Sequence, residues 1–328
     1  MQDFILRAWH HKNVFFYLVL IPISYLFSAI VTLRHWAYKL GLLPSIRLPV
    51  PVIIVGNINM GGSGKTPVVI WLVQQLIKQG YTPGVISRGY RGNQLQPTAV
   101  NQASLAHQVG DEPLLIARRA NCPVWIGKNR VAAGQALLEA HPACDVIISD
   151  DGLQHYHLQR TIEIAVVDDE SIGHQYILPA GPLREPQQRL NQVDAVINHS
   201  QQPIQHAYQM QLCGQTFYNL ADTTKTVTAD FFSNKQLKAI AGIGKPARFF
   251  NTLSDLGLTV EGLSFDDHHQ FSQQDLAAIH CEALLMTEKD AVKCQSFAQS
   301  HYWVLPIEAK IDKTLLPMLL AKLKTASH

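Results

Sequence analysis

A glycine-rich loop between an apolar strand and an apolar helix constrains this chain more than any other feature. Residues 52–67 read VIIVGNINMGGSGKTP, and the apolar stretch VVIWLVQQL follows. The glycines let backbone N–H groups turn toward one anion, and the helix N-terminus adds its dipole. In such a loop Lys65 can reach the β- and γ-phosphates of a nucleotide, and the Thr66 hydroxyl can hold Mg²⁺. The predicted cofactor-binding residues are Asn59, Met60, Gly61, Gly62, Ser63, Gly64, Lys65 and Thr66.

The loop departs from the strict phosphate-loop pattern at one position. The strict pattern has a glycine five residues before Gly64, whereas this chain has Asn59, so the match is to the core GGSGKT. ATPases that partition DNA or position division sites carry a lysine directly before the paired glycines. Met60 stands there and counts against that class. The alternative interpretation is a glycine-rich turn with an incidental lysine.

Short β-branched runs alternate with helical stretches after residue 44, which is typical of a parallel α/β sheet. Several runs are apolar on both faces, as central parallel strands are. The expected strands are 52–55, 84–87, 124–127, 145–149, 162–167 and 195–198. We therefore predict an α/β fold with a P-loop NTPase-type parallel-sheet domain, a second, smaller α/β domain and an N-terminal hydrophobic helix.

The domain organisation is predicted from changes in composition along the chain. A polar, glutamine-rich passage at 201–215 breaks the rhythm, and a second α/β pattern begins near Leu237. Its expected elements are strands at 239–244, 284–287 and 302–307, an amphipathic helix at 249–256 and a closing helix at 313–328. The predicted divisions are 1–43 for a membrane-associating segment, 44–205 for a P-loop kinase domain, 206–236 for a linker and 237–328 for a C-terminal α/β domain.

The amino-terminal stretch at 14–33 contains no Asp, Glu, Lys or Arg. Its length is about the 20 residues that cross the hydrocarbon core of a bilayer. We favour a membrane anchor, with a buried core helix and a removed signal as alternatives. Pro22 also permits a kinked or interfacial helix, and basic residues on both sides leave the orientation open. The flanking basic residues are Arg7, Lys12, Arg34 and Lys39.

Paired carboxylates follow the expected strand at 145–149, in the sequence DVIISDDGLQH. Asp150 and Asp151 should lie at the carboxyl end of that strand, where nucleotides bind in open α/β sheets. Carboxylates there organise Mg²⁺ and its waters in phosphoryl-transfer enzymes. The sequence therefore predicts Thr66, Asp150 and Asp151 as metal-site residues, against the alternative of a helix-capping or solvated pair.

Composition excludes several classes of function. The net charge is +2 and no basic run occurs, so we expect no nucleic-acid partner. The five cysteines have no C-x-x-C spacing, which indicates reduced structural thiols rather than a zinc or dithiol site. His268 and His269 are adjacent, and neighbouring side chains rarely bind one metal ion.

Five further polar clusters follow in order, namely SRGYRG, GDEP, LPAGPLREP, DDHHQF and TEKDAVK. Together with the hydrophobic terminus, VGNINMGGSGKTP and ISDDGLQH, they resemble the tetraacyldisaccharide 4'-kinase family of lipid A biosynthesis over nearly the whole chain. The family's loosened first glycine also accommodates Asn59.

The resemblance implies an ATP- and Mg²⁺-dependent kinase that phosphorylates the 4' hydroxyl of a tetraacylated glucosamine disaccharide 1-phosphate. It implies a membrane surface and a lipid-linked substrate as partners, the cytoplasmic face of the inner membrane as location, and no obligate protein partner. By motif, Asp111 is the implied base, His268 supports it, and Lys65 and Arg184 neutralise charge on the transferring group. The further residues expected in the cleft are Arg88, Glu112, Gln154 and Asp267.

Two rival functions stay open on the sequence. One is a membrane-attached P-loop NTPase switch that acts through a protein partner. The other is a P-loop kinase or ligase for a soluble metabolite, with the apolar terminus buried in the core. A requirement for an acylated sugar separates the first rival from the predicted kinase, and partitioning between membrane and soluble fractions separates the second.

Overall fold

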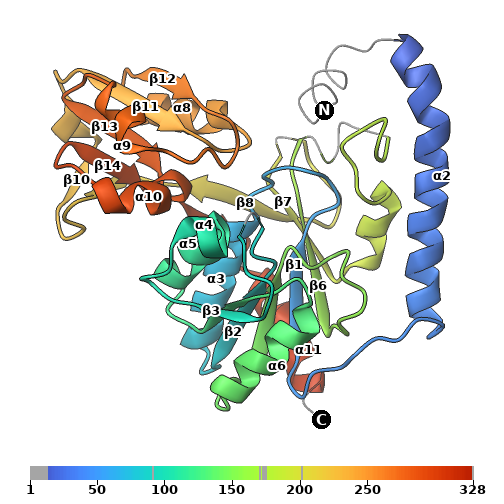
Figure 1. The fold of residues 1–328 in the computed structure, drawn as a ribbon. Helices are drawn as coiled ribbons and strands as arrows, with labels where there is room; N and C mark the ends of the chain where they lie inside the picture. The colour runs from blue at the N-terminus through green and yellow to red at the C-terminus, as the bar shows by residue number, and fades with distance from the viewer. Residues whose placement is uncertain (1–13, 91, 170, 172–175, 201, 327–328) are drawn as a thin grey trace.

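The computed structural model describes residues 14–90, 92–169, 171, 176–200 and 202–326. Figure 1 shows two α/β bodies, each built on its own sheet, and a long helix, α2 (Val14–Lys39), that stands along one side of the larger body. We call the body with the larger sheet the first body and the other the second body. The basic flanks predicted at Arg7 and Lys12 lie outside the described residues.

The first body contains a nine-stranded sheet among the described residues. Its central strands are parallel, and an antiparallel strand closes each edge. In spatial order the strands are β15 (Glu308–Ile311), β8 (Tyr208–Cys213), β7 (Ala195–Asn198), β6 (Ile162–Val167), β1 (Val52–Gly56), β5 (Val146–Asp150), β2 (Pro83–Ser87), β4 (Val124–Ile126) and β3 (Thr98–Val100).

Helices cover both faces of this sheet, so strand β1 is buried on both sides. Ile53 and Val55 belong to the core beneath α3 (Lys65–Lys78), α5 (Asp111–Arg119) and α11 (Leu315–Ala326). Val52 and Ile54 belong to the opposite core, which includes α6 (Arg130–Ala140). The alternation follows from the two-residue period of a strand. Two further helices of the first body are α4 (Ala106–Val109) and the 3₁₀ helix η1 (Gln187–Gln192).

The second body contains a six-stranded sheet with helices on both faces. In spatial order its strands are β10 (Thr226–Thr228), β9 (Thr216–Asn219), β14 (Tyr302–Leu305), β13 (Ala283–Thr287), β11 (Leu237–Ala241) and β12 (Glu261–Ser264). Helix α8 (Pro246–Asp255) packs on one face, and α9 (Gln273–Ala277) and α10 (Glu288–Cys294) pack on the other. Two short 3₁₀ helices are η2 (Ala229–Phe232) and η3 (Gln295–Phe297).

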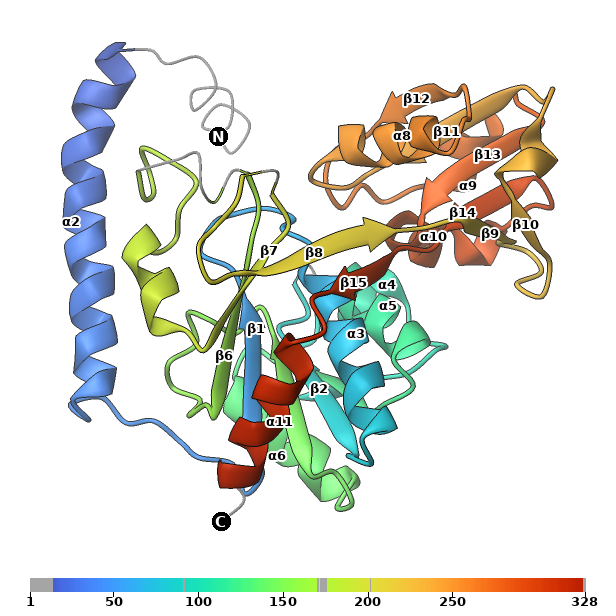
Figure 2. The same cartoon turned by 180° about the vertical axis from the view of Figure 1, so that it is seen from behind.

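Two antiparallel chain segments join the bodies. Strand β8 leads into β9, and β14 returns into β15, which pairs with β8 (Figure 2). A Cβ atom built at Gly214 would lie 2.6 Å from the Pro306 carbonyl oxygen, so the two segments approach too closely for any larger residue. The chain therefore enters and leaves the second body at one place.

The two sheets divide the chain differently from the predicted domain boundaries. Those boundaries stay a prediction. Strands β8, β9 and β10 lie within the predicted linker 206–236. Strand β15 and helix α11 lie within the predicted C-terminal domain 237–328 but belong to the first body. The reason is local, because only one residue of β8 is buried and the exposed Gln209 and Gln211 hide its β pattern.

Helix α2 is mostly exposed. Only 6% of its candidate spanning window, Val19–Lys39, is buried, so this helix is not the core helix considered as an alternative. It is the one helix of the described residues long and apolar enough to cross a membrane. Phe27 and Val31 pack against the first body, whereas Tyr25, Leu26 and Leu33 are exposed.

Candidate active site

The predicted nucleotide loop connects β1 to the first turn of α3. Gly61 and Gly64 have φ angles of 107° and 87°, a left-handed backbone that favours glycine. Gly64 is the N-cap residue of α3, and the first turn of this helix carries no acidic side chain. The Ser63 hydroxyl is buried without a hydrogen-bond partner among the described residues. This turn therefore has the backbone and charge that favour an anion.

Two buried asparagines brace the loop from behind. Asn57 donates hydrogen bonds to the Asn59 side-chain oxygen at 3.0 Å and to the Gly61 carbonyl at 3.4 Å. Asn59 in turn donates to the Met60 carbonyl at 3.3 Å and to Asp168 at 3.4 Å. Asn59 is fully buried. Asn59, which stands where the strict pattern has glycine, thus supplies a side-chain amide that a glycine would lack.

Asp151 brings two basic side chains to the mouth of the loop. Its carboxylate lies 3.4 Å from Lys65 Nζ and 3.2 Å from Arg184 Nη1. Burial raises the pKa of Asp151, but Lys65 and Arg184 outweigh burial and hold the pKa below its ordinary value. Asp151 is therefore ionised throughout the physiological range. The cations predicted to face a transferring phosphate converge on this carboxylate.

Asp150 has the opposite electrostatic surroundings. Burial raises its pKa to about 7, and the neighbouring carboxylates of Glu112 and Asp151 add to the shift. Ser87 donates a hydrogen bond to Oδ2 at 3.0 Å. The other carboxylate oxygen, Oδ1, is buried without a partner among the described residues. One buried oxygen is therefore left for a cation that would hold Asp150 ionised.

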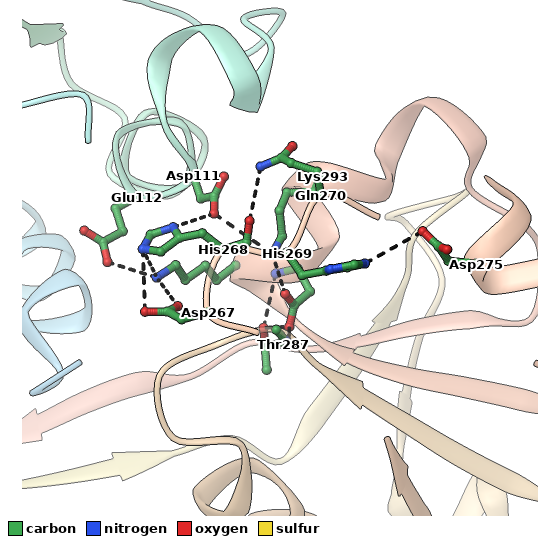
Figure 3. Close-up of polar contacts among 12 residues, drawn as sticks. Asp111, Glu112, Asp267, His268, His269, Gln270, Asp275, Thr287 and Lys293 are labelled. Carbon is green, nitrogen blue, oxygen red and sulfur yellow. Dashed lines mark hydrogen bonds and ion pairs between the residues drawn. The ribbon is translucent and has the colours of Figure 1, made fainter. Parts of the chain in front are cut away.

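Asp111 and His268 meet across the two bodies (Figure 3). Asp111 begins helix α5 of the first body, and His268 follows strand β12 of the second. His268 Nδ1 lies 2.9 Å from Asp111 Oδ2, and both side chains are buried. A Cβ atom built at Gly244 would lie 3.6 Å from the Gly62 amide nitrogen and 3.5 Å from Asp267 Oδ2. The second body therefore packs directly against the nucleotide loop beside this pair.

Lys289 fixes the tautomer of His268. Its Nζ lies 3.3 Å from His268 Nε2, 3.3 Å from Asp267 and 3.2 Å from Glu112. Burial lowers the pKa of Lys289, but Glu112, Asp267 and Asp111 together raise it above its ordinary value. An ammonium group only donates, so Nε2 accepts and the proton sits on Nδ1. His268 consequently donates a hydrogen bond from Nδ1 to Asp111 Oδ2.

A second ion pair ties the bodies together behind the loop. Asp168 is fully buried at the carboxyl end of β6 and accepts a hydrogen bond from Lys245 of the second body at 2.6 Å. Burial raises the pKa of Asp168, but the hydrogen bond from Lys245 outweighs it and lowers the pKa. Because Asp168 also contacts Asn59, the second body is linked to the nucleotide loop through one carboxylate.

The remaining predicted residues have different contacts and different exposure. Gln154 donates a hydrogen bond to the Asn57 carbonyl at 2.9 Å, and Thr66 is half-buried in the first turn of α3. Glu112 and Asp267 face each other across Lys289. Arg88 is exposed, and its charge acts on buried Arg130.

Sequence reasoning missed four polar residues of this region. Asp168 carries the same signal as Asp150, since it directly follows an apolar strand. Lys289 belongs to TEKDAVK, which was quoted as a motif without a role. Lys245 and buried Arg130 carry no comparable signal, because each depends on a partner far away in the sequence.

A family model described as tetraacyldisaccharide-1-P 4'-kinase matches residues 16–324. The chain belongs to this family. The tetraacyldisaccharide 4'-kinase of Methylobacillus flagellatus is 46% identical over 318 residues, which are 97% of this chain and 95% of that protein. The tetraacyldisaccharide 4'-kinase of Azoarcus sp. (strain BH72) is 48% identical over 313 residues, which are 94% of this chain and 92% of that protein. The predicted family is confirmed.

A solved structure of the tetraacyldisaccharide 4'-kinase family shares the fold. The crystal structure of LpxK from Aquifex aeolicus in complex with ATP superposes with a TM-score of 0.79 at 28% identity. The match covers 92% of this chain and 98% of that chain. The predicted α/β architecture with a P-loop domain, a second α/β domain and an N-terminal apolar helix is confirmed.

Proposed function

We propose that this chain is an ATP-dependent kinase that transfers the γ-phosphate to the 4' hydroxyl of a tetraacylated glucosamine disaccharide 1-phosphate in lipid A biosynthesis. The observation that carries this proposal is the Asp111–His268 contact beside the nucleotide loop. It joins a proton acceptor from one body to an imidazole of the other. A phosphoryl acceptor with a hydroxyl group requires such a base within reach.

The nucleotide loop and the two nearby cations supply the phosphate side of the site. Phosphoryl transfer depends on positioning and charge neutralisation more than on covalent chemistry. Lys65 and Arg184 already converge on Asp151, so they need small side-chain movements to face phosphate oxygens. The backbone N–H groups between Met60 and Thr66 would hold the β- and γ-phosphates.

Thr66 and Asp150 would hold Mg²⁺. Hard oxygen ligands suit this ion, and the unpartnered, buried oxygen of Asp150 fits the need for one carboxylate ligand. When bound, Mg²⁺ would neutralise charge on the β- and γ-phosphates. Among the described side chains, no group of three His, Cys, Asp or Glu residues is arranged as a metal site. A ligand set completed by phosphate oxygens and water agrees with this finding.

Asp111 would accept the proton of the sugar hydroxyl during transfer. The Nδ1–H of His268 orients the carboxylate, and Lys289 holds the imidazole in that tautomer. Because Asp111 is buried beside a fixed donor, its orientation toward the hydroxyl would be its main contribution.

Helix α2 would hold the enzyme at the cytoplasmic face of the inner membrane, where a four-chain lipid is confined to the bilayer. Its exposed apolar side chains and spanning length support this role. An enzyme held at the surface finds such a substrate by diffusion in two dimensions. The partners in this proposal are therefore the membrane surface and the lipid-linked disaccharide.

The proposal is tested with labelled ATP and a tetraacylated disaccharide 1-phosphate in mixed micelles, with and without Mg²⁺. We expect the label to move to the lipid only when Mg²⁺ is present. Hydrolysis of ATP without a phosphorylated lipid would contradict the proposal and favour an NTPase switch. A soluble sugar that accepts phosphate as well as the lipid would favour a kinase of soluble metabolites.

A further inference from the structure

A single buried polar side chain connects helix α2 to the body of the enzyme. Among the described side chains of α2, Ser24 alone is both polar and buried, with 3% exposure. Its hydroxyl donates a hydrogen bond to the Ile177 carbonyl at 2.8 Å and accepts one from the Ala180 amide at 2.9 Å. The hydroxyl thus donates to and accepts from the same loop, which lies more than 150 residues away in the sequence.

That loop, residues 177–185, is hydrogen-bonded to the nucleotide loop along its backbone. The Met60 amide donates to the Pro182 carbonyl at 2.8 Å, and the Arg184 amide donates to the Ile58 carbonyl at 2.6 Å. Between these points Leu178 N–H bonds the Leu183 carbonyl at 2.8 Å, which closes the loop on itself. Ser24 is consequently linked to both the phosphate-binding backbone and Arg184 by short hydrogen-bonded paths.

A second contact between α2 and this region reaches Glu185. The His35 ring lies edge-on to the Tyr156 ring, with centroids 4.9 Å apart. Tyr156 donates a hydrogen bond to Glu185 at 2.9 Å, and the Glu185 side chain is 1% exposed. Glu185 directly follows Arg184. Helix α2 therefore contacts the loop 177–185 directly near its beginning, and through Tyr156 it is connected to the end of the loop.

Anchoring alone does not require these contacts. An anchor needs apolar surface, which Ile23, Tyr25 and Leu26 already expose on either side of Ser24. Serine is less favourable than alanine or leucine inside a helix, because its hydroxyl competes for backbone hydrogen bonds. Here the hydroxyl bonds instead to the loop that carries Arg184. The contact has the character of a mechanical link rather than of membrane attachment.

We propose that Ser24 is a positioning residue that couples helix α2 to the loop 177–185, so that the placement of α2 at the membrane sets the position of Arg184 and of the phosphate-binding backbone. This inference rests on the proposed kinase function for its catalytic readout. It adds a coupling role to a helix whose other role is attachment. The coupling acts through the loop that carries Arg184, since both hydrogen bonds of the Ser24 hydroxyl go to that loop.

The test compares Ser24→Ala with Ser28→Ala in the full chain. Ser28 lies one helical turn further along α2 and makes no side-chain hydrogen bond within the described structure, so it is a matched control. We expect Ser24→Ala to lower kcat on the lipid about tenfold, the effect of roughly one lost buried hydrogen bond. Flotation with vesicles of anionic and zwitterionic lipid should stay as in the wild type.

A second measurement does not depend on the reaction. Ser24→Ala removes the acceptor of the Ala180 amide, so hydrogen exchange at Ala180 should be about tenfold faster, with exchange in strand β13 unchanged. Unchanged exchange at Ala180, an unchanged kcat, or an equal loss in Ser28→Ala would each overturn the coupling. A wild-type chain that phosphorylates no lipid would instead refute the proposed function, and the exchange result would still decide the contact.

Discussion

At the scale of single residues, two non-glycine residues of the site have a backbone conformation that favours glycine. Asp151 has a φ of 49° and His268 a φ of 63°. Non-glycine residues in this region are strained by about 1 kcal/mol or more, and such strain gathers at functional sites. Each residue directs a polar side chain into the cleft, Asp151 toward Lys65 and His268 toward Asp111. The strained backbone is thus found at the two residues that make these contacts.

Removing either member of the buried pair should affect turnover and spare nucleotide binding. Asp111→Ala removes the proposed base, and His268→Ala removes the donor that orients it. We expect kcat to fall about 10²-fold or more in each variant, as for loss of general base catalysis. ATP affinity, measured by titration calorimetry, should change little, because the nucleotide loop is untouched. Near-normal turnover in either variant would refute the assignment.

The tautomer of His268 provides a spectroscopic prediction. With ¹⁵N-labelled histidine, the wild-type protein at pH 7.5 should show His268 protonated at Nδ1, because Lys289 donates to Nε2. Lys289→Met removes that donor, so we expect a mixture of tautomers and a kcat about tenfold lower. Lys225→Met, which alters an exposed lysine of the second body, is the control. A wild-type spectrum with the proton on Nε2 would contradict this geometry.

At the scale of elements, the strands and helices with strong apolar patterns were predictable, and the polar ones were not. The six strands expected in the first body begin and end within one residue of those observed. Each is buried, so its β-branched run reflects packing. The strands not predicted are β3, β8, β9, β10, β12 and β15, because they are short or have few buried residues.

Helix α2 is the element whose removal should release the protein from the membrane. Deletion of residues 1–32 removes most of the exposed apolar surface of α2, so much of the protein should move to the soluble fraction. Phosphorylation of the lipid should fall further than basal ATP hydrolysis, because the nucleotide loop itself stays. Fractionation and the two activities measured side by side check this. A truncated protein that stays fully membrane-bound would mean that other surfaces provide the anchor.

At the scale of the whole molecule, the site exists only where the two bodies meet. Asp111 and Glu112 come from the first body, whereas His268 and Lys289 come from the second. The motifs GDEP, DDHHQF and TEKDAVK identified these segments, but sequence alone did not reveal that Lys289 contacts Glu112, Asp267 and His268. Such convergence depends on the relative placement of two sheets, which no local pattern encodes.

The Asp168–Lys245 pair should contribute to stability over a defined pH range. The pKa of Asp168 in the folded state lies below the ordinary value of 3.8, so its contribution is present above pH 3.8 and is lost as pH falls through the lower folded value. Lys245→Met should lower the free energy of unfolding by about 2 kcal/mol at pH 7, since it leaves the buried Asp168 carboxylate with only the more distant Arg248, at 3.5 Å, as a basic partner.

Urea denaturation of the wild type, Lys245→Met and the surface variant Lys225→Met checks this prediction. The Lys225–Asp222 pair is exposed, so Lys225→Met should have almost no effect. The difference caused by Lys245→Met should stay constant from pH 8 to pH 5 and shrink below about pH 3.8. If the free energies of unfolding of the wild type and Lys245→Met are equal at neutral pH, the Asp168–Lys245 pair adds nothing to stability.

The return of the chain through strand β15 and helix α11 has a consequence for how the protein is made. Leu315, Leu319 and Leu323 are fully buried in the first core, yet they follow the whole second body in the sequence. The second body, whose strands end at Leu305, can therefore complete its sheet before the first body completes its own. The phosphate-binding body is completed only after the second body has been synthesised.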